Sequence, residues 1–464
     1  MDKATILYIA KDSIFRKTHE LILYVLYGVF FVVLYQLFHQ SNVDLIPFEV
    51  VLLSFSYGLL IFVTWLFQKN IIRYWKLLVI LMILPVLMIL LYNPPGNFMF
   101  PFGDEYTYYL FFNNPDLKPP LSTSYLYIRW LQIWKKWISW SGFRFINLLS
   151  YISSVGILFI VIKQRYGKKV AKLSVFLMMF SPLEIWFANS YYKESLYILM
   201  FSLLVWCLHN SQSRNFTGRF YSFTFIDMVF SLFLLLGLSL IRSYSIVLSI
   251  PIFLYVTSLK NVRRVKKVIF SLFIVLILTI GLIFYYYNAI NQGDFALTKM
   301  TIYRGLLRIG LTGSILSNIM SFFSSLVLAL FLPLPYIFTN KETVYTLLDY
   351  ISCFEGFISI IILPYAFLTI TQNFLRRSHD EKDEFSSFLV WIYLVMILGI
   401  ALSGYVFTYR HYVGFRWILY ILSAIGKHRI KSDKIVIKRK RIFEFLVFFM
   451  VILINAYRYF YPRS

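Results

Sequence analysis

Long apolar runs separated by short polar connections dominate the hydropathy pattern of this chain. About 20 apolar residues cross a bilayer core as a helix. By that measure the predicted spans are 21–38, 48–67, 76–92, 145–162, 170–187, 195–208, 224–240, 245–258, 268–286, 346–371, 387–403, 413–425 and 442–457. The pattern therefore predicts an all-α fold, a polytopic transmembrane helical bundle of about 13 spans. We expect one integral membrane domain over 1–464.

Two longer connections interrupt this pattern and are expected on the outer side of the membrane. The first, 93–145, carries an acidic motif and aromatic interfacial helices, and the second is 288–345. Within the second, 319–338 is apolar but contains Pro333 and Pro335. If it crossed, the basic connection 426–441 would face outward, against the positive-inside rule. We therefore expect 319–338 to stay outside or to be re-entrant.

The composition supports a membrane protein with its N-terminus in the cytoplasm. The chain has 464 residues, is 59% hydrophobic and carries a formal net charge of +24. Most Lys and Arg residues fall in the connections predicted to be cytoplasmic, where they face anionic lipid, so we do not expect nucleic acid as a partner. The first twenty residues lack the pattern of a cleavable signal peptide. Heavy use of Ile, Phe, Tyr and Lys suggests an AT-rich bacterial genome, so we expect the membrane to be a bacterial plasma membrane.

The two cysteines do not indicate a metal site or a disulfide framework. Cys207 and Cys353 lie in or beside different apolar runs, without the spacing of zinc ligands. We interpret both as packing residues.

Two adjacent carboxylates, Asp104 and Glu105, follow the third predicted span in the run Gly103-Asp104-Glu105-Tyr106. Charges beside a membrane need a partner, a metal or a substrate proton, which makes them candidates for function. The alternative is structural, with Asp104 paired to Lys118 or Arg129 within the loop.

Aromatic residues from Tyr125 to Trp140 predict an amphipathic helix that lies in the membrane interface. A sugar-stacking surface would use the same residues, and the pattern does not separate the two.

Lys193 and Glu194 lie in the turn after the fifth predicted span. Glu194 suits the start of a helix, so it is as readily a helix-start residue as an acid or base. Lys193 opposes the helix dipole and therefore calls for an anion. That anion is either a substrate phosphate or Glu184, at the end of the preceding span.

Four arginines on the predicted outer side are further candidates for binding phosphate. Arg242 lies in a very short turn between two spans, where pairing or contact with lipid phosphate would also explain it. Arg304 and Arg308 are spaced i, i+4, which places both on one helix face. Arg410 precedes the twelfth span beside His411, a candidate acid or base.

With these residues the chain resembles the polytopic glycosyltransferases of the type C fold, the group that includes protein O-mannosyltransferases and lipid A aminoarabinose transferases. The resemblance rests on Gly103-Asp104-Glu105-Tyr106 followed by Tyr109 in a large external loop beside interfacial helices. The Ser181-Pro182 to Lys193-Glu194 stretch, Pro333-Leu334-Pro335 and Tyr409-Arg410-His411 are similar to bacterial members and to surface-polysaccharide polymerases.

The resemblance implies a sugar donor on a polyprenyl phosphate or diphosphate, and a glycan, lipid or protein acceptor. It implies that Asp104 is the general base of an inverting transfer. Glu105 would orient that acid, or share a divalent metal such as Mg²⁺ or Mn²⁺ in members that use one. The candidate cations for the leaving phosphate are Lys193, Arg242, Arg304, Arg308 and Arg410.

Two other functions fit parts of the sequence. A surface-polysaccharide polymerase acting on lipid-diphosphate-linked repeat units would depend on arginines and a histidine rather than on the carboxylates. A flippase or transporter of lipid-linked glycans would place charges midway along several spans. Here the charged exceptions Asp227, Asp349 and Glu355 lie toward span ends, which favours the glycosyltransferase.

Overall fold

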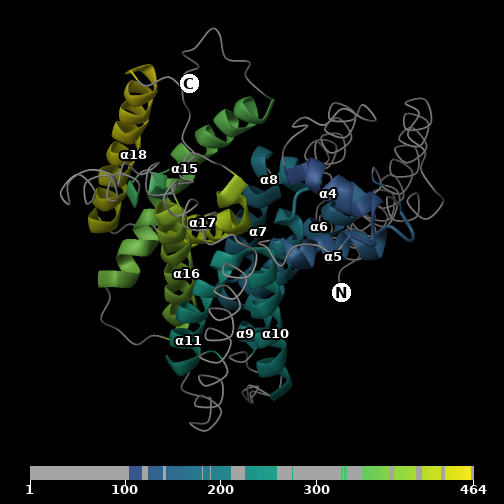
Figure 1. The fold of residues 1–464 in the computed structure, drawn as a ribbon. Helices are drawn as coiled ribbons and strands as arrows, with labels where there is room; N and C mark the ends of the chain where they lie inside the picture. Colours follow the sequence, from purple (N-terminus) through teal and green to yellow (C-terminus); the bar gives the residue numbers. More distant parts are fainter. Residues whose placement is uncertain are drawn as a thin grey trace, which may run out of the picture. The chain divides into compact units, whose positions relative to one another are not determined.

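The part of the chain that this computed structural model describes is helical. It comprises residues 104–117, 124–138, 140, 143–179, 181–188, 190–210, 225–258, 274, 326–327, 329–331, 347–375, 381–403, 410–429 and 434–460, and contains no strand (Figure 1). The predicted all-α class is therefore confirmed for the described residues. The predicted spans 21–38, 48–67 and 76–92 lie outside them, as does nearly all of 268–286 and most of 319–338.

The chain divides into two compact units, which we describe separately. Unit 1 contains α4 (Asp104–Asn113), most of α5 (Tyr125–Trp134), the first half of α6 (Phe143–Tyr166) and residues 188–192. Unit 2 contains the rest of α5 and α6, α7 (Lys168–Met179) and all but the last residue of α8 (Pro182–Ala188). It also contains α9 (Glu194–Asn210), α10 (Phe225–Ile241), η2 (Ser243–Leu248), α11 (Ser249–Ser258), α15 (Leu347–Leu375), α16 (Glu381–Ser403), α17 (Arg410–Arg429) and α18 (Lys434–Phe460).

Apolar helix length supports membrane spans in the described residues. Two helical segments, Ile146–Tyr166 and Ser352–Phe374, are long and apolar enough to cross a bilayer, and they match the predicted spans 145–162 and 346–371. Shorter apolar helices lie at Glu194–His209, Val229–Ile241 and Glu384–Ile400, close to three other predicted spans.

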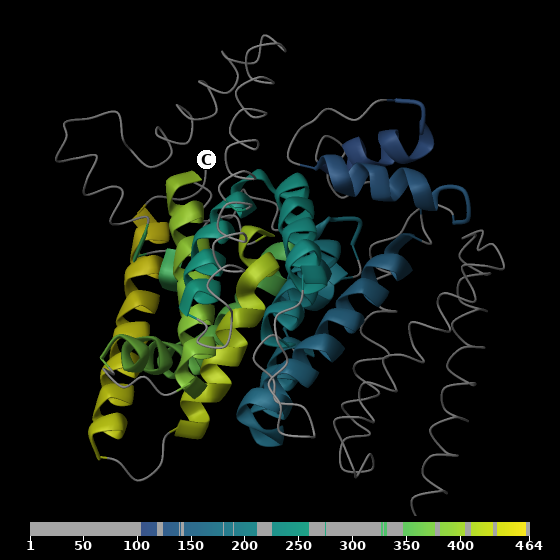
Figure 2. The same ribbon diagram turned by 90° about the horizontal axis from the view of Figure 1, so that it is seen from below.

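Helix α17 is the centre of unit 2. It packs against α7, α9, α15 and α16 (Figure 2). Every residue from 412 to 426 is buried. Its contacts with α15 advance along both helices together. Arg416 bonds Glu355 and Ser359, and further along both helices the carbonyl of Leu422 accepts a hydrogen bond from Thr369. The two helices therefore run in the same direction, as expected if α16 is the return crossing between them.

The predicted span 170–187 is not one straight helix. It is divided into α7 and α8, which are bent by 66° at a short break. Counting apolar residues could not reveal this break. Ser181-Pro182 explains where α8 begins, because Ser181 accepts a hydrogen bond from the Glu184 backbone N–H at 3.1 Å, and proline is favoured at the first helical position.

Hydroxyl groups on the apolar helices bond within their own helix. Ser174, Ser202 and Ser359 each donate to the carbonyl four residues earlier. Such bonds satisfy hydroxyls where water is scarce. Neither Cys207 nor Cys353 forms a disulfide among the described residues, and Cys207 is buried.

A close backbone approach of α15 and α17 predicts a stability effect at Gly426. A Cβ there would overlap the Tyr365 carbonyl oxygen, which cannot move without moving α15. We expect Gly426→Ala to lower the free energy of unfolding by about 1–3 kcal/mol, the usual cost of overpacking. The measurement is the thermal unfolding midpoint of the purified protein in detergent.

Gly399→Ala in α16 is the matched control, since a Cβ there meets nothing within 4 Å. It should leave the midpoint unchanged or raise it, because alanine favours helix over glycine by about 1 kcal/mol. Equal midpoints for the two variants would contradict the close α15–α17 approach.

Candidate functional site

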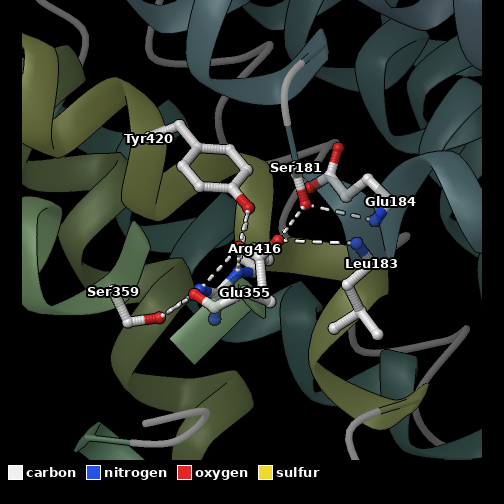
Figure 3. A network of polar contacts seen from close by, with 7 residues as sticks. All are labelled: Ser181, Leu183, Glu184, Glu355, Ser359, Arg416 and Tyr420. Carbon is white, nitrogen blue, oxygen red and sulfur yellow. Dashed lines mark hydrogen bonds and ion pairs between the residues drawn. The ribbon is translucent and has the colours of Figure 1, made fainter. Parts of the chain in front are cut away.

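The carboxylate of Glu355 on α15, in unit 2, is fully buried and accepts several hydrogen bonds. Its Oε1 accepts from Arg416 Nε at 2.8 Å and from the Tyr420 hydroxyl at 2.6 Å. Its Oε2 accepts from the Ser181 hydroxyl at 2.7 Å (Figure 3). One carboxylate therefore joins α15, α17 and the break between α7 and α8.

Arg416 is held on several sides by the same network. Its Nη2 lies 2.8 Å from Glu355 Oε1 and also donates to the Ser359 hydroxyl, one turn further along α15. Its guanidinium carbon is 5.6 Å from the Tyr420 ring centre. Because both charged side chains are at most 2% exposed, each neutralises the other away from water.

The Glu355 carboxylate also approaches the start of α8. Leu183 N lies 3.5 Å from Glu355 Oε2, and Glu184 follows in the same first turn. Negative charge is favoured near the start of a helix, where backbone N–H groups lack helical acceptors. Glu184 is itself 1% exposed and lies beside Ser181 in Figure 3.

A second buried ion pair joins α9 to the residue that follows α10. Arg242 Nη2 donates to Glu194 Oε1, and the two side chains are 2% and 0% exposed. The Arg242 guanidinium lies over the Tyr197 ring at 5.5 Å, and the Tyr197 hydroxyl accepts from Ser245 at 2.9 Å. Lys193, just before α9, donates to the Ser124 hydroxyl at 2.6 Å.

The two ion pairs lie at the same end of the bundle. A Cβ added to Gly414, two residues before Arg416, would come within 2.9 Å of the Tyr197 ring. One turn further along, Phe201 on α9 meets Trp417 on α17 at 5.2 Å between ring centres. The contacts thus run from Glu194 through Arg242 and Tyr197 to α17 and Glu355.

Unit 1 holds the predicted acidic motif on a helix packed by aromatic rings. Asp104 and Glu105 are the first residues of α4, and Tyr108 and Phe112 on this helix are buried. The ring centres of Tyr109 and Phe112 lie 5.5 and 5.3 Å from that of Trp140, which stacks on Tyr191 at 4.0 Å. In the same unit Asn147 Nδ2 donates to the carbonyls of Ser190 and Tyr192.

The structure therefore places the predicted site residues in three ways. Lys193, Glu194 and Arg242 are buried and bonded within unit 2. Asp104 and Glu105 open α4, and Arg410 and His411 open α17, but their side chains are not among those described. Arg304 and Arg308 lie outside the described residues.

Sequence reasoning missed the pairing of Glu355 with Arg416. The available signal was a charge inside each of two predicted spans, since Arg416 lies within 413–425 and Glu355 within 346–371. A charge in an apolar span requires a partner, but the identity of that partner depends on how helices distant in sequence pack.

No cluster of three His, Cys, Asp or Glu residues suited to a metal ion occurs within the described ranges. Comparison of the chain with protein-family models, curated proteins and solved structures found no match.

Removing one charge from the Glu355–Arg416 pair should be strongly destabilising. Glu355→Gln leaves Arg416 buried without a carboxylate, and breaking a buried pair in this way costs about 3–5 kcal/mol. The double variant Glu355→Gln/Arg416→Met removes both charges and should lose less than the sum of the two single variants. Thermal midpoints in detergent for the four proteins of this double-mutant cycle give the coupling.

The control is Glu444→Gln, which removes the partner of Lys440 in an ion pair whose side chains are 46% and 25% exposed. It should cost at most about 1 kcal/mol. Strictly additive effects of the Glu355 and Arg416 substitutions would show that the two charges do not interact.

Proposed function

We propose that this protein is a membrane glycosyltransferase that moves a sugar from a polyprenyl phosphate or diphosphate carrier to an acceptor hydroxyl on the outer face of the membrane. The proposal includes the type C fold, about 13 spans, a cytoplasmic N-terminus and a bacterial plasma membrane. The acceptor is a glycan, a lipid or a protein.

The observation that supports this function best is the position of the acidic pair at the start of α4. Asp104 lies one turn before the buried Tyr108 and two turns before the buried Phe112. The aromatic contacts of α4 with Trp140 and Phe143 fix this helix within unit 1. A general base must be held within hydrogen-bond reach of the hydroxyl that it deprotonates, and a packed helix supplies that rigidity.

Aromatic rings around α4 suit a sugar substrate as well. Tyr106 on α4 is 38% exposed, and Trp137, which follows α5, is 51% exposed. Exposed aromatic ring faces provide an apolar surface against which a pyranose can pack.

In the proposed reaction Asp104 takes the proton of the acceptor hydroxyl while that oxygen attacks the anomeric carbon. The bond from the anomeric carbon to the carrier phosphate oxygen breaks at the same time, so the configuration inverts and the electron pair leaves with the phosphate. Glu105 orients Asp104. Cations stabilise the negative charge that develops on the leaving phosphate.

Arg242 fits a supporting role better than direct contact with that phosphate. Its guanidinium already faces Glu194 and the Tyr197 ring in a fully buried setting. We therefore propose Lys193, Arg304, Arg308 and Arg410 as the cations that meet the leaving phosphate. Where a divalent metal takes part, Asp104 and Glu105 are its proposed ligands, and His411 and Glu194 are further candidate acids or bases.

A second candidate function is a surface-polysaccharide polymerase that joins lipid-diphosphate-linked repeat units. It is favoured by the burial of two arginines, Arg242 and Arg416, at one end of unit 2, since charged residues kept inside a membrane bundle are functional by default. Transport of a lipid-linked glycan is a third candidate, which the break between α7 and α8 favours because discontinuous helices build many transporter sites.

Asp104→Asn should abolish sugar transfer while leaving the protein folded. Loss of a general base lowers the rate by about 10²–10⁴-fold, and asparagine keeps the size and the helix-start preference of aspartate. The measurement is transfer of radiolabelled sugar from polyprenyl-phosphate donors in membranes that contain equal amounts of each protein.

Asp116→Asn is the matched control, an exposed acid in the turn that follows α4. It should retain full activity. Retention of transfer in Asp104→Asn together with its loss in Arg410→Ala would exclude the general-base role and favour the polymerase. Carrier movement across the membrane without any glycosyl transfer by the wild type would favour transport.

A further inference from the structure

One face of α18 exposes a continuous apolar stripe. Its residues recur at helical spacing and are 39–67% exposed: Ile442, Phe445, Leu446, Phe448, Phe449, Ile452 and Leu453. The opposite face, with Val447 and Met450, is buried, where α18 packs against α15. The stripe thus has a defined direction, away from the bundle.

Two exposed basic residues lie at the N-terminal end of the same stripe. Lys438 and Arg441 are exposed and precede Phe445 by seven and four residues, so the helical repeat places them on the exposed side. The stripe from Ile442 to Leu453 is about 17 Å long at 1.5 Å per residue. That length is close to half of a hydrocarbon core of about 30 Å, the depth of one leaflet.

The neighbouring residue Lys440 lies on a different side of α18 from the stripe. Lys440 bonds Glu444 at 2.7 Å and lies over the Tyr365 ring at 5.1 Å, on the side of α18 that faces α15. The hydrogen bond to Glu444 raises the pKa of Lys440, which keeps it charged. Glu444 is thus engaged by Lys440 rather than by the two cations of the stripe.

We infer that this face of α18 binds an anionic phospholipid, with the headgroup phosphate between Lys438 and Arg441 and the acyl chains along Phe445, Phe448 and Ile452. The inference is independent of the proposed glycosyl transfer. In this arrangement the positive charges of Lys438 and Arg441 bind a lipid of one leaflet. The position of its headgroup then sets the depth of α18 in the bilayer.

The charge pattern favours a phospholipid over a second copy of this chain. A twofold contact through the stripe, with both copies in the same membrane orientation, would bring Lys438 and Arg441 of each copy close to those of the other. That repulsion has no carboxylate on the stripe to offset it. A headgroup phosphate supplies the charge that the basic end requires.

The test uses the purified full-length protein in neutral detergent, titrated separately with phosphatidylglycerol and phosphatidylcholine, with bound lipid counted by native mass spectrometry. The wild type should prefer phosphatidylglycerol. Lys438→Gln/Arg441→Gln should lose about thirtyfold in affinity for it, because each cation near an anionic headgroup contributes a factor of about five. Added salt should weaken wild-type binding of phosphatidylglycerol.

The matched control is Lys169→Gln/Lys427→Gln, which removes two exposed lysines from other helices and changes the net charge equally. It should retain the wild-type affinity. An equal loss in this control, or no preference for phosphatidylglycerol in the wild type, would overturn the inference. The inference would also be overturned if a polyprenyl phosphate displaced phosphatidylglycerol more strongly than phosphatidylglycerol itself does. A disulfide-linked dimer of Phe448→Cys in phosphatidylglycerol vesicles would overturn it too, because a second copy would then cover the stripe.

All variants replace exposed side chains, and their thermal midpoints should match that of the wild type. If the double variant is unstable, salt dependence of wild-type binding decides, because binding through acyl chains alone would not weaken with salt.

Discussion

The buried carboxylate of Glu355 imposes the strongest constraint on the described part of unit 2. A charge in an apolar bundle is very costly unless donors surround it, and here these are Arg416, Tyr420 and Ser181. Because they come from α17 and from the break after α7, satisfying one carboxylate fixes three segments. The same set of bonds holds the start of α8, which Ser181 caps, and the register of α15 against α17.

The second ion pair extends this constraint across α9. Glu194 fixes Arg242, Arg242 lies on Tyr197, and Tyr197 fills the space that the missing side chain of Gly414 leaves on α17. A larger residue at position 414 would displace a ring whose hydroxyl is also bonded to Ser245. The two pairs are therefore mechanically connected through packed side chains, which carry displacement efficiently because protein interiors are densely filled.

Within the described residues, hydropathy located apolar helices, because a span requires only composition and length. The predicted spans 145–162 and 346–371 correspond to α6 and α15. The same measure missed the bend at Ser181-Pro182, since an apolar count continues through a break that capping creates. It also missed the union of Glu355 with Arg416, because residues 61 positions apart meet only through tertiary packing. Predictions for Arg304 and Arg308 concern residues outside the described ranges.

The buried pairs also bear on how a leaving phosphate could be stabilised. A cation contributes most to a transition state when it is preorganised toward the developing charge rather than toward a carboxylate of the protein. Arg416 and Arg242 each face a glutamate, so moving either to a phosphate would expose a buried carboxylate at high cost. Lys193 differs, because its ammonium donates to the neutral hydroxyl of Ser124 immediately before α9. Exchanging that hydroxyl for a phosphate oxygen would gain a charged acceptor, and the start of α9 would add favourable dipole energy. This contact with a neutral hydroxyl distinguishes Lys193 from Arg242 and Arg416, which each contact a carboxylate.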